Sequence, residues 1–455
     1  MRAHNETDFL RTAGECGVAH TMIDLGEVPK HREHTAATAA TRPPVPYRPV
    51  LGALSILLIV LLAGAAHRNP PRPPVIIPAR LSDVTFVDGD RLFVVGVGPA
   101  LLGSDVQNKV VSRYTLPGAK LLSRTTVAVA GSVSNVRWAG GTILVSYRVD
   151  ATGSEATVAA TEGTATALWR QPFALVVVSA AAGAALVNFD YGRPGDFGWA
   201  VVDLKTGVIR WSLRQPLNGY ISDFGYADGF PRWFVTLTAD GHVEIRDART
   251  GAVTATGTVP RIGRNVNGSA WSVDDLLMVV TGRTGVTAYT LPGLTPRWHS
   301  DVDLLQGWLQ TGCGAVICTF GQQRGMAAFD PATGRKLWDS DRWAYAEPIG
   351  RYLAATLPPE SIDQPKLWLL DPLTGRVYGN FGAWQSLGTD GESTLTYAMN
   401  QVYGTYVVWY GVLDPDRLRV RILGSASRVS GDCHVSAGAL ICRLVDASVG
   451  VWQLG

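Results

Sequence analysis

Asp330-Pro331-Ala332-Thr333-Gly334-Arg335-Lys336-Leu337-Trp338 is the stretch that decides the fold, because its skeleton recurs along the chain. The segment from Asp203 to Trp211 has the same form, and Asp247 and Asp371 each begin the same D-x-x-T-G string. A unit that recurs at a fixed period of about 40 residues predicts a row of equivalent supersecondary structures.

The D-x-x-T-G string has the chemistry of a β-hairpin turn. Its Asp can accept a hydrogen bond from the backbone N–H two residues on, and Pro331 and Pro372 preset φ at the next position. The closing glycine is expected to adopt the left-handed conformation that returns the chain to a strand. The predicted turn residues are Asp203 and Gly207, Asp247 and Gly251, Asp330 and Gly334, and Asp371 and Gly375.

A tryptophan eight residues after the start of such a turn lies on the returning strand. There it can bury a large apolar area against the next unit while its N–H finds a partner. The predicted docking residues are Trp169, Trp211, Trp298 and Trp338. With weaker copies included, the turns begin at residues 115, 161, 203, 247, 290, 330 and 371, the spacing of four-stranded propeller blades. We therefore predict an all-β fold, a single β-propeller over residues 75–455.

The number of blades follows less directly from the pattern. Two further stretches, Leu395–Leu423 and Asp432–Leu454, alternate like strands but contain no D-x-x-T-G string. Together with the seven turns they make eight or nine units, and we interpret one as a divergent half. Eight blades are favoured, and seven is the alternative. The chain ends on a third-strand-like run, so Val75–Leu81 is expected to supply the fourth strand and close the ring.

Ala328 to Trp338 resembles the repeat of the pyrroloquinoline-quinone-like, or quinoprotein-type, propellers, A-x-D-x-x-T-G-K-x-x-W, with Arg335 in place of Lys. The resemblance covers residues 80–455 and implies a membrane-anchored propeller of actinobacterial type. It implies no single activity. Cofactor-dependent alcohol and sugar dehydrogenases, a lipoprotein of outer-membrane assembly and propellers without known activity share the repeat. Quinoprotein dehydrogenases hold their cofactor beneath a vicinal Cys-Cys disulfide, and this chain has no adjacent cysteines. We therefore expect no cofactor and no metal, and we assign no catalytic residue.

The segment Val50–Ala66 has no charged residue over 17 positions, the short end of the range for a membrane-spanning helix. Ala63-Gly64-Ala65 resembles a signal-peptide cleavage site, which is the alternative. We predict an uncleaved anchor at 50–66, with a disordered cytoplasmic tail at 1–49 and a proline-rich linker at 67–74.

The cysteines indicate on which side of the membrane the propeller lies. Cys313 and Cys318 form one closely spaced pair, and Cys433 and Cys442 form another, whereas Cys16 precedes the apolar segment. Paired cysteines beyond a membrane span predict two disulfides in an oxidising compartment. Four buried free thiols are the alternative. We expect a single-pass membrane protein with a cytoplasmic N-terminus and an extracytoplasmic propeller.

Neither composition nor motifs identify an activity. The net charge is +2, with no Lys/Arg-rich run, so nucleic acid is not expected as a partner. The serine-hydrolase, zinc-protease, EF-hand and P-loop strings are absent from the sequence. His242, His299 and His434 have no partner at metal-ligand spacing.

Two hypotheses follow from this. The first is a binding or scaffold module for an unknown protein or cell-envelope partner on one propeller face, with the loops 99–108, 191–197 and 358–365 as candidate contacts. The alternative is an extracytoplasmic quinoprotein-like oxidoreductase or a hydrolase with its site in the propeller funnel.

Overall fold

The structure is a computed structural model whose described residues all lie within the compact unit Pro71–Gly455. It describes residues 73–99, 106–149, 153–190, 197–227, 229–261, 270–281, 285–301, 308–310, 313–321, 325–358, 366–390, 394–402 and 404–454. The predicted tail at 1–49, the predicted anchor at 50–66 and most of the linker at 67–74 lie outside these ranges. Within them, no helix has the length and apolar character needed to cross a membrane.

The described residues form nine four-stranded antiparallel sheets, which we call blades 1 to 9. In blades 1 to 8, four consecutive strands pair in chain order. Blades 1 to 4 comprise β2 (Val84–Asp88), β3 (Arg91–Val97), β4 (Gln107–Thr115), β5 (Leu121–Val129); β6 (Val133–Ala139), β7 (Thr142–Arg148), β8 (Glu155–Thr161), β9 (Ala167–Gln171); β10 (Ala174–Ser179), β11 (Ala184–Phe189), β12 (Gly198–Asp203), β13 (Ile209–Arg214); and β14 (Tyr220–Phe224), β15 (Trp233–Leu237), β16 (His242–Asp247), β17 (Val253–Thr258).

The remaining blades continue this order until the last one. Blades 5 to 8 comprise β18 (Ala270–Val273), β19 (Leu276–Thr281), β20 (Gly285–Thr290), β21 (Pro296–Ser300); β22 (Trp308–Gln310), β23 (Ile317–Gly321), β24 (Gly325–Phe329), β25 (Lys336–Ser340); β26 (Tyr345–Ile349), β27 (Tyr352–Thr356), β28 (Trp368–Leu370), β29 (Val377–Asn380); and β30 (Gln385–Thr389), β31 (Thr396–Gln401), β32 (Val407–Asp414), β33 (Arg419–Ser427). Blade 9 comprises β34 (Val429–Ser436), β35 (Ala439–Leu444), β36 (Val449–Gln453) and β1 (Val75–Ile77).

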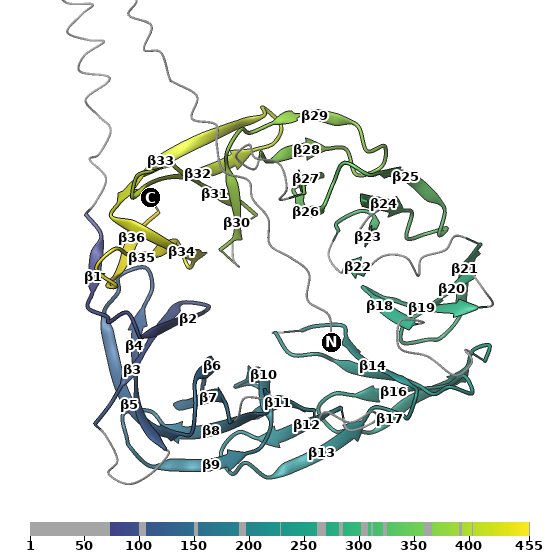
Figure 1. Ribbon diagram of the computed structural model, residues 1–455. Coiled ribbons are helices and arrows are strands. Elements are labelled where there is room, and N and C mark those ends of the chain that lie inside the picture. Colours follow the sequence, from purple (N-terminus) through teal and green to yellow (C-terminus); the bar gives the residue numbers. More distant parts are fainter. Residues whose placement is uncertain are drawn as a thin grey trace, which may run out of the picture. The chain divides into compact units, whose positions relative to one another are not determined.

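The sheets lie side by side around one axis, with the first strand of each nearest that axis (Figure 1). The middle strands are continuous apolar runs, such as β11, because neighbouring blades cover both of their faces. The fourth strands alternate instead, as in β13, because one of their faces is more open to solvent.

The core consists of nine clusters of buried side chains, each shared by two neighbouring blades. The cluster between blades 9 and 1 closes the ring: it joins Ile441 and Val451 to Leu92 and Val94. In blade 9, β1 pairs with β36 through Val75 and Val451, Ile76 and Gly450, and Ile77 and Val449. The N-terminal strand therefore supplies the missing fourth strand, as the sequence predicts.

The prediction of eight blades is wrong, because the two further units, around Leu395–Leu423 and Asp432–Leu454, are both complete four-stranded blades. The eighth blade turns at Asp414, where Leu418 has a φ of 49° in place of the repeat's left-handed glycine. The ninth borrows its last strand from the other end of the described chain. Backbone pairing needs neither the Trp nor the Gly of the repeat, so the unit that we interpret from the sequence as a divergent half is a full blade.

Each predicted docking tryptophan lies on a fourth strand and packs on the turn glycine of the next blade. A Cβ built on Gly334 would lie 2.3 Å from Trp298, and one on Gly375 would lie 2.7 Å from Trp338. Gly207 and Gly251 approach Trp169 and Trp211 in the same way.

Three of the four indoles also donate a hydrogen bond to this turn. The acceptors are the carbonyls of Leu204, Pro331 and Pro372, at 2.8 to 2.9 Å. The buried indole N–H of Trp211 has no acceptor among the described residues.

At two contacts between neighbouring blades, which we call joins, the small residue is at the tryptophan position and the large residue is at the glycine position. Ala255 and Gly379 occupy the tryptophan position of blades 4 and 7, and the turns of the next blades carry Leu294 and Leu418 where the repeat has glycine. A Cβ on Gly379 would lie 2.1 Å from Leu418, and one on Gly257 would lie 2.9 Å from Leu294. The large side chain has moved to the opposite blade, which keeps the join filled.

Gly334→Ala should destabilise the fold by about 2–5 kcal/mol, since left-handed strain adds to a clash with Trp298. Gly350 is the matched control, because its φ of 56° is also positive but a Cβ there would meet nothing within 4 Å. Gly350→Ala should cost only the strain, about 1–2 kcal/mol. Urea denaturation measures both, and equal losses would refute tryptophan-on-glycine docking as the constraint.

Ile77→Ala should destabilise the ring by about 2–5 kcal/mol, because Ile77 is 2% exposed in the closing cluster. Its neighbour Ile76 is 48% exposed, so Ile76→Ala should change the free energy of unfolding by less than about 0.5 kcal/mol. Thermal unfolding of the two variants tests the closure, and a similar loss for both would argue against it.

Candidate functional site

The aspartates of the repeat are occupied by their own turns. Asp247 Oδ1 accepts hydrogen bonds from the backbone N–H groups of Arg249 and Thr250 at 3.0 and 2.8 Å. Asp203, Asp330 and Asp371 accept equivalent bonds. The hydrogen bond from Arg210, with those from its turn, holds the pKa of Asp203 well below its usual range. Each of the four belongs to a different blade, so they form no convergent site.

The other predicted residues also have local partners. Disulfides join Cys313 to Cys318 beside Trp343, and Cys433 in β34 to Cys442 in β35. His242 Nε2 lies 3.6 Å from Glu244, and His299 contacts Thr287 and Asp301. His434 lies on β34, opposite Ile441. Cys433, Cys442 and His434 belong to blade 9, and the other residues belong to blades 4, 5 and 6.

A cavity of about 700 Å³ between blades 4 and 5 is the candidate site. Its wall is formed by the first strands of the two blades, β14 and β18, by the β14–β15 connection and by the turns that precede β19 and β21. In an antiparallel meander these turns lie at the same end of the sheets, which is also the end that carries the D-x-x-T-G turns. The cavity therefore opens toward that face of the ring.

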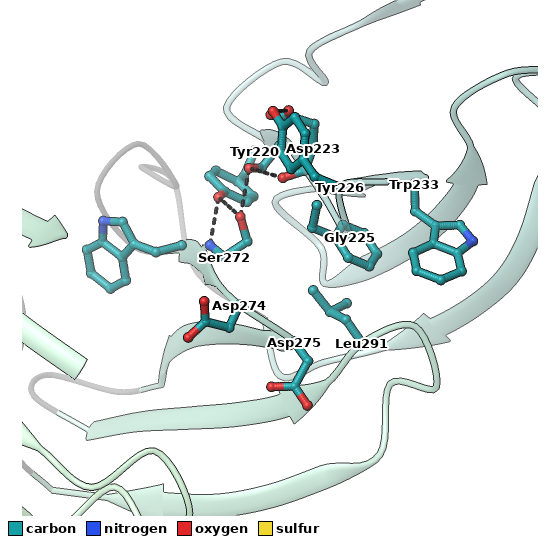
Figure 2. A pocket seen from close by; sticks show the side chains of 12 residues that line it. Tyr220, Asp223, Gly225, Tyr226, Trp233, Ser272, Asp274, Asp275 and Leu291 are labelled. Atoms are coloured by element: carbon teal, nitrogen blue, oxygen red, sulfur yellow. Dashed lines mark hydrogen bonds between the residues drawn. The ribbon is translucent and has the colours of Figure 1, made fainter. Parts of the chain in front are cut away.

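A hydroxyl cluster joins the two blades at this cavity (Figure 2). The backbone N–H of Ser272 donates to the Tyr220 hydroxyl at 2.8 Å, and the Ser222 and Ser272 hydroxyls lie 2.7 Å apart. The Tyr220 hydroxyl is also 3.3 Å from Ser272 Oγ. Because β14 and β18 come from different blades, these bonds fix the width of the cavity.

Three carboxylates lie around this cluster. In the view of Figure 2, Asp223 lies on one side of Ser272, and Asp274 and Asp275 lie on the other. Asp223 accepts a hydrogen bond from the Tyr226 hydroxyl. Burial, this bond and the Asp223 charge together raise the pKa of Tyr226 far above its usual range.

Asp274 and Asp275 form the turn between β18 and β19, where Asp274 has a φ of 51°. Asp275 lies 3.6 Å from the Arg297 guanidinium. Desolvation by the surrounding atoms raises the pKa of Asp274, and the neighbouring Asp275 charge raises it further. Asp274 is exposed and lines the cavity, and no cation of the described residues pairs with its carboxylate.

Aromatic rings complete the wall. Trp233 stacks on Phe224 with ring centroids 5.5 Å apart and an angle of 27° between the planes. Gly225 allows this arrangement, because its φ is +67° and a Cβ there would lie 2.7 Å from Trp233. Trp271 and Tyr226 also line the cavity, and Tyr226 is 59% exposed.

The described residues of the wall supply carboxylates, hydroxyls and aromatic faces, with no Lys, Arg, His or Cys among them. Within the part of the chain that the structure describes, no three His, Cys, Asp or Glu side chains group as a metal site would require. The arrangement is suited to holding a ligand by hydrogen bonds, charge and ring contacts.

Sequence reasoning missed this site entirely. Its residues come from two blades, and Tyr220 and Ser272 are 52 positions apart in the chain. The one local signal was the Trp271 to Asp275 stretch, in which two adjacent carboxylates follow a tryptophan. The predicted contact loops 99–108, 191–197 and 358–365 lie mostly outside the described residues.

Two smaller cavities accompany the first. One of about 330 Å³ lies against Pro231, Arg232 and Asp247 in blade 4, and one of about 190 Å³ lies between Tyr345 of blade 7 and Trp384 beside blade 8. The 700 Å³ and 190 Å³ cavities thus occur at the two joins that have leucine in place of the turn glycine.

The fold defines the chain as a β-propeller of four-stranded blades, with a cavity of binding character between two of them.

No protein-family model matches the sequence, and no curated protein matches it. Solved structures do match. BamB from Moraxella catarrhalis is 16% identical, covers 83% of this chain and 100% of its own, and has a TM-score of 0.37. The C-terminal WD40 domain of Sif2 is 10% identical, with 85% and 98% coverage and a TM-score of 0.40. The dihydro-heme d1 dehydrogenase NirN is 15% identical, with 72% and 84% coverage and a TM-score of 0.36.

Asp274→Asn should raise the melting temperature at pH 7 by a few degrees, about 1–4 °C. A carboxyl with a raised folded-state pKa is ionised at neutral pH at a cost to folding, and Asn removes that cost. The gain should disappear below about pH 3.9, where the unfolded carboxyl is protonated too. Asn also tolerates the left-handed backbone at this position.

Scanning calorimetry at several pH values measures this effect. Asp339→Asn is the control, because Asp339 is exposed and paired with Lys336, and it should bring no gain. A lower melting temperature for Asp274→Asn at pH 7 would contradict an uncompensated charge at this site.

Proposed function

We propose that this chain is a binding module, tethered to a membrane by residues 50–66, whose propeller lies outside the cytoplasm. In this proposal the cavity between blades 4 and 5 holds part of the partner. The observation that carries it is the cavity itself, whose wall offers hydroxyls, carboxylates and rings on a closed scaffold.

The scaffold supports a binding role because it restricts the conformational freedom of the side chains at the site. Ser222 lies on β14 and Ser272 on β18, and each of these strands pairs with a buried strand of its own blade. The hydrogen bond between the two serines connects blade 4 to blade 5. A preorganised site loses less conformational entropy when a partner binds.

The extracytoplasmic location rests on two features. One is the uncharged segment Val50–Ala66, which is long enough for a short membrane span. The other is the pair of disulfides, Cys313–Cys318 and Cys433–Cys442, since reducing compartments seldom keep such bonds. Both lie on the C-terminal side of the apolar segment.

Epitope tags at the two ends of the full chain test this topology. In cells whose cytoplasmic membrane is intact but whose outer layers are permeable, the C-terminal tag should bind antibody. The N-terminal tag should do so only after the membrane is lysed. Loss of the N-terminal tag from the mature protein would indicate a cleaved signal peptide, and a hidden C-terminal tag would refute the orientation.

The thiols give a second readout of the same compartment. Protein denatured without reductant should take up one maleimide per chain, at Cys16, and none in the Cys16→Ser variant. Labelling at Cys313 or Cys433 under these conditions would remove the argument from an oxidising exterior.

A further inference from the structure

We infer that the cavity between blades 4 and 5 takes the ammonium or guanidinium group of a lysine or arginine side chain presented by a protein partner. This inference rests on the proposed binding function and adds the chemistry of the partner. Its basis is the combination, in one cavity, of carboxylates, aromatic faces and a hydroxyl cluster.

The charge of the cavity is the first argument. Asp223, Asp274 and Asp275 all line it, whereas the two cations recorded next to its lining residues, Arg297 at 3.6 Å from Asp275 and Arg232 at 5.9 Å from the ring centre of Trp233, are not part of the described lining. Asp274 makes no hydrogen bond or ion pair within the described part of the chain, and its pKa is raised by desolvation and by Asp275. A bound cation would relieve this repulsion.

The aromatic wall is the second argument, because the face of an indole or phenol ring attracts a cation. The fold already uses this pairing elsewhere. Arg342 lies 4.7 Å from the ring centre of Trp343 and 4.4 Å from that of Trp368. In the cavity, Trp271 and Tyr226 provide such faces beside the carboxylates, and Tyr226 is accessible from solvent.

The same features disfavour a metal ion and a neutral sugar. The carboxylates do not converge as a metal requires, since no three acidic, His or Cys side chains of the described residues form a metal-binding group. A neutral sugar would use the rings and hydroxyls but would leave the charge of Asp274 uncompensated. A cationic group can contact the carboxylates, the aromatic rings and the hydroxyls of the cavity together.

A side chain on a polypeptide fits better than a small free cation. The cavity volume of about 700 Å³ exceeds what one ammonium group fills, and the rest of the wall includes Ser222, Ser272 and Leu291. These hydroxyls and the leucine suit the amide groups and methylenes of a peptide segment. The mouth opens on the turn face, where a large partner can approach.

Fluorescence anisotropy with the full chain in detergent micelles tests the inference. The probe is a fluorescein-labelled octapeptide of alternating glycine and lysine, and the matched ligand is the same peptide with acetylated lysines. We expect the lysine peptide to bind more weakly as salt increases, and the acetylated peptide not to bind.

The double variant Asp274→Asn/Asp275→Asn should lose about tenfold or more in affinity, as expected when a charge-assisted hydrogen bond is removed. Trp271→Leu should weaken binding severalfold through the lost ring contact. The control Asp339→Asn/Asp341→Asn removes two exposed charges from blade 6 and its following turn, and it should bind like the parent. Circular dichroism confirms that each variant is folded.

Three outcomes would overturn the inference: unchanged affinity in the Asp274/Asp275 variant, equal binding of the acetylated peptide, or displacement of the peptide by spermidine at matched charge concentration. Displacement by chito-oligosaccharide would assign the cavity to sugar instead. None of these results bears on the tag topology, so failure here is distinguishable from failure of the proposed membrane tethering.

Discussion

Packing between neighbouring blades is the interaction on which this molecule depends. A four-stranded sheet with two apolar faces cannot bury either face alone, so each blade is stable only between two others. Nine shared clusters meet this requirement around the ring, and the one between blades 9 and 1 leaves no open end. The three residues of β1 matter because they complete the sheet on which that last cluster rests.

The outer edges of the joins from blades 2 and 3 to blades 7 and 8 obey a rule of matched volumes. A tryptophan needs a residue without a Cβ opposite it, and a leucine in the turn needs a small residue on the preceding blade. The two leucine joins, at Leu294 and Leu418, are also the joins with cavities. The site thus occupies a join that differs from the repeat.

Much of the fold could be predicted from residues that act locally. Asp330 and Gly334 define a turn by their own hydrogen bonding and φ, and Trp338 lies a fixed number of residues later. The closing strand could be predicted from the unfinished last sheet. The number of blades could not be fixed in this way, because turns such as that at Asp414 have a leucine in the left-handed conformation that sequence rules assign to glycine.

The sequence by itself determined the all-β class, the position of the repeat turns and the pairing of neighbouring cysteines, since each depends on residues within one hairpin or one short span. Only the tertiary structure decided that nine sheets close the ring, because closure depends on the summed geometry of every join. It also decided the cavity. Tyr220 and Ser272 meet because two blades stand beside each other, and no local pattern encodes a contact between residues so far apart in the chain.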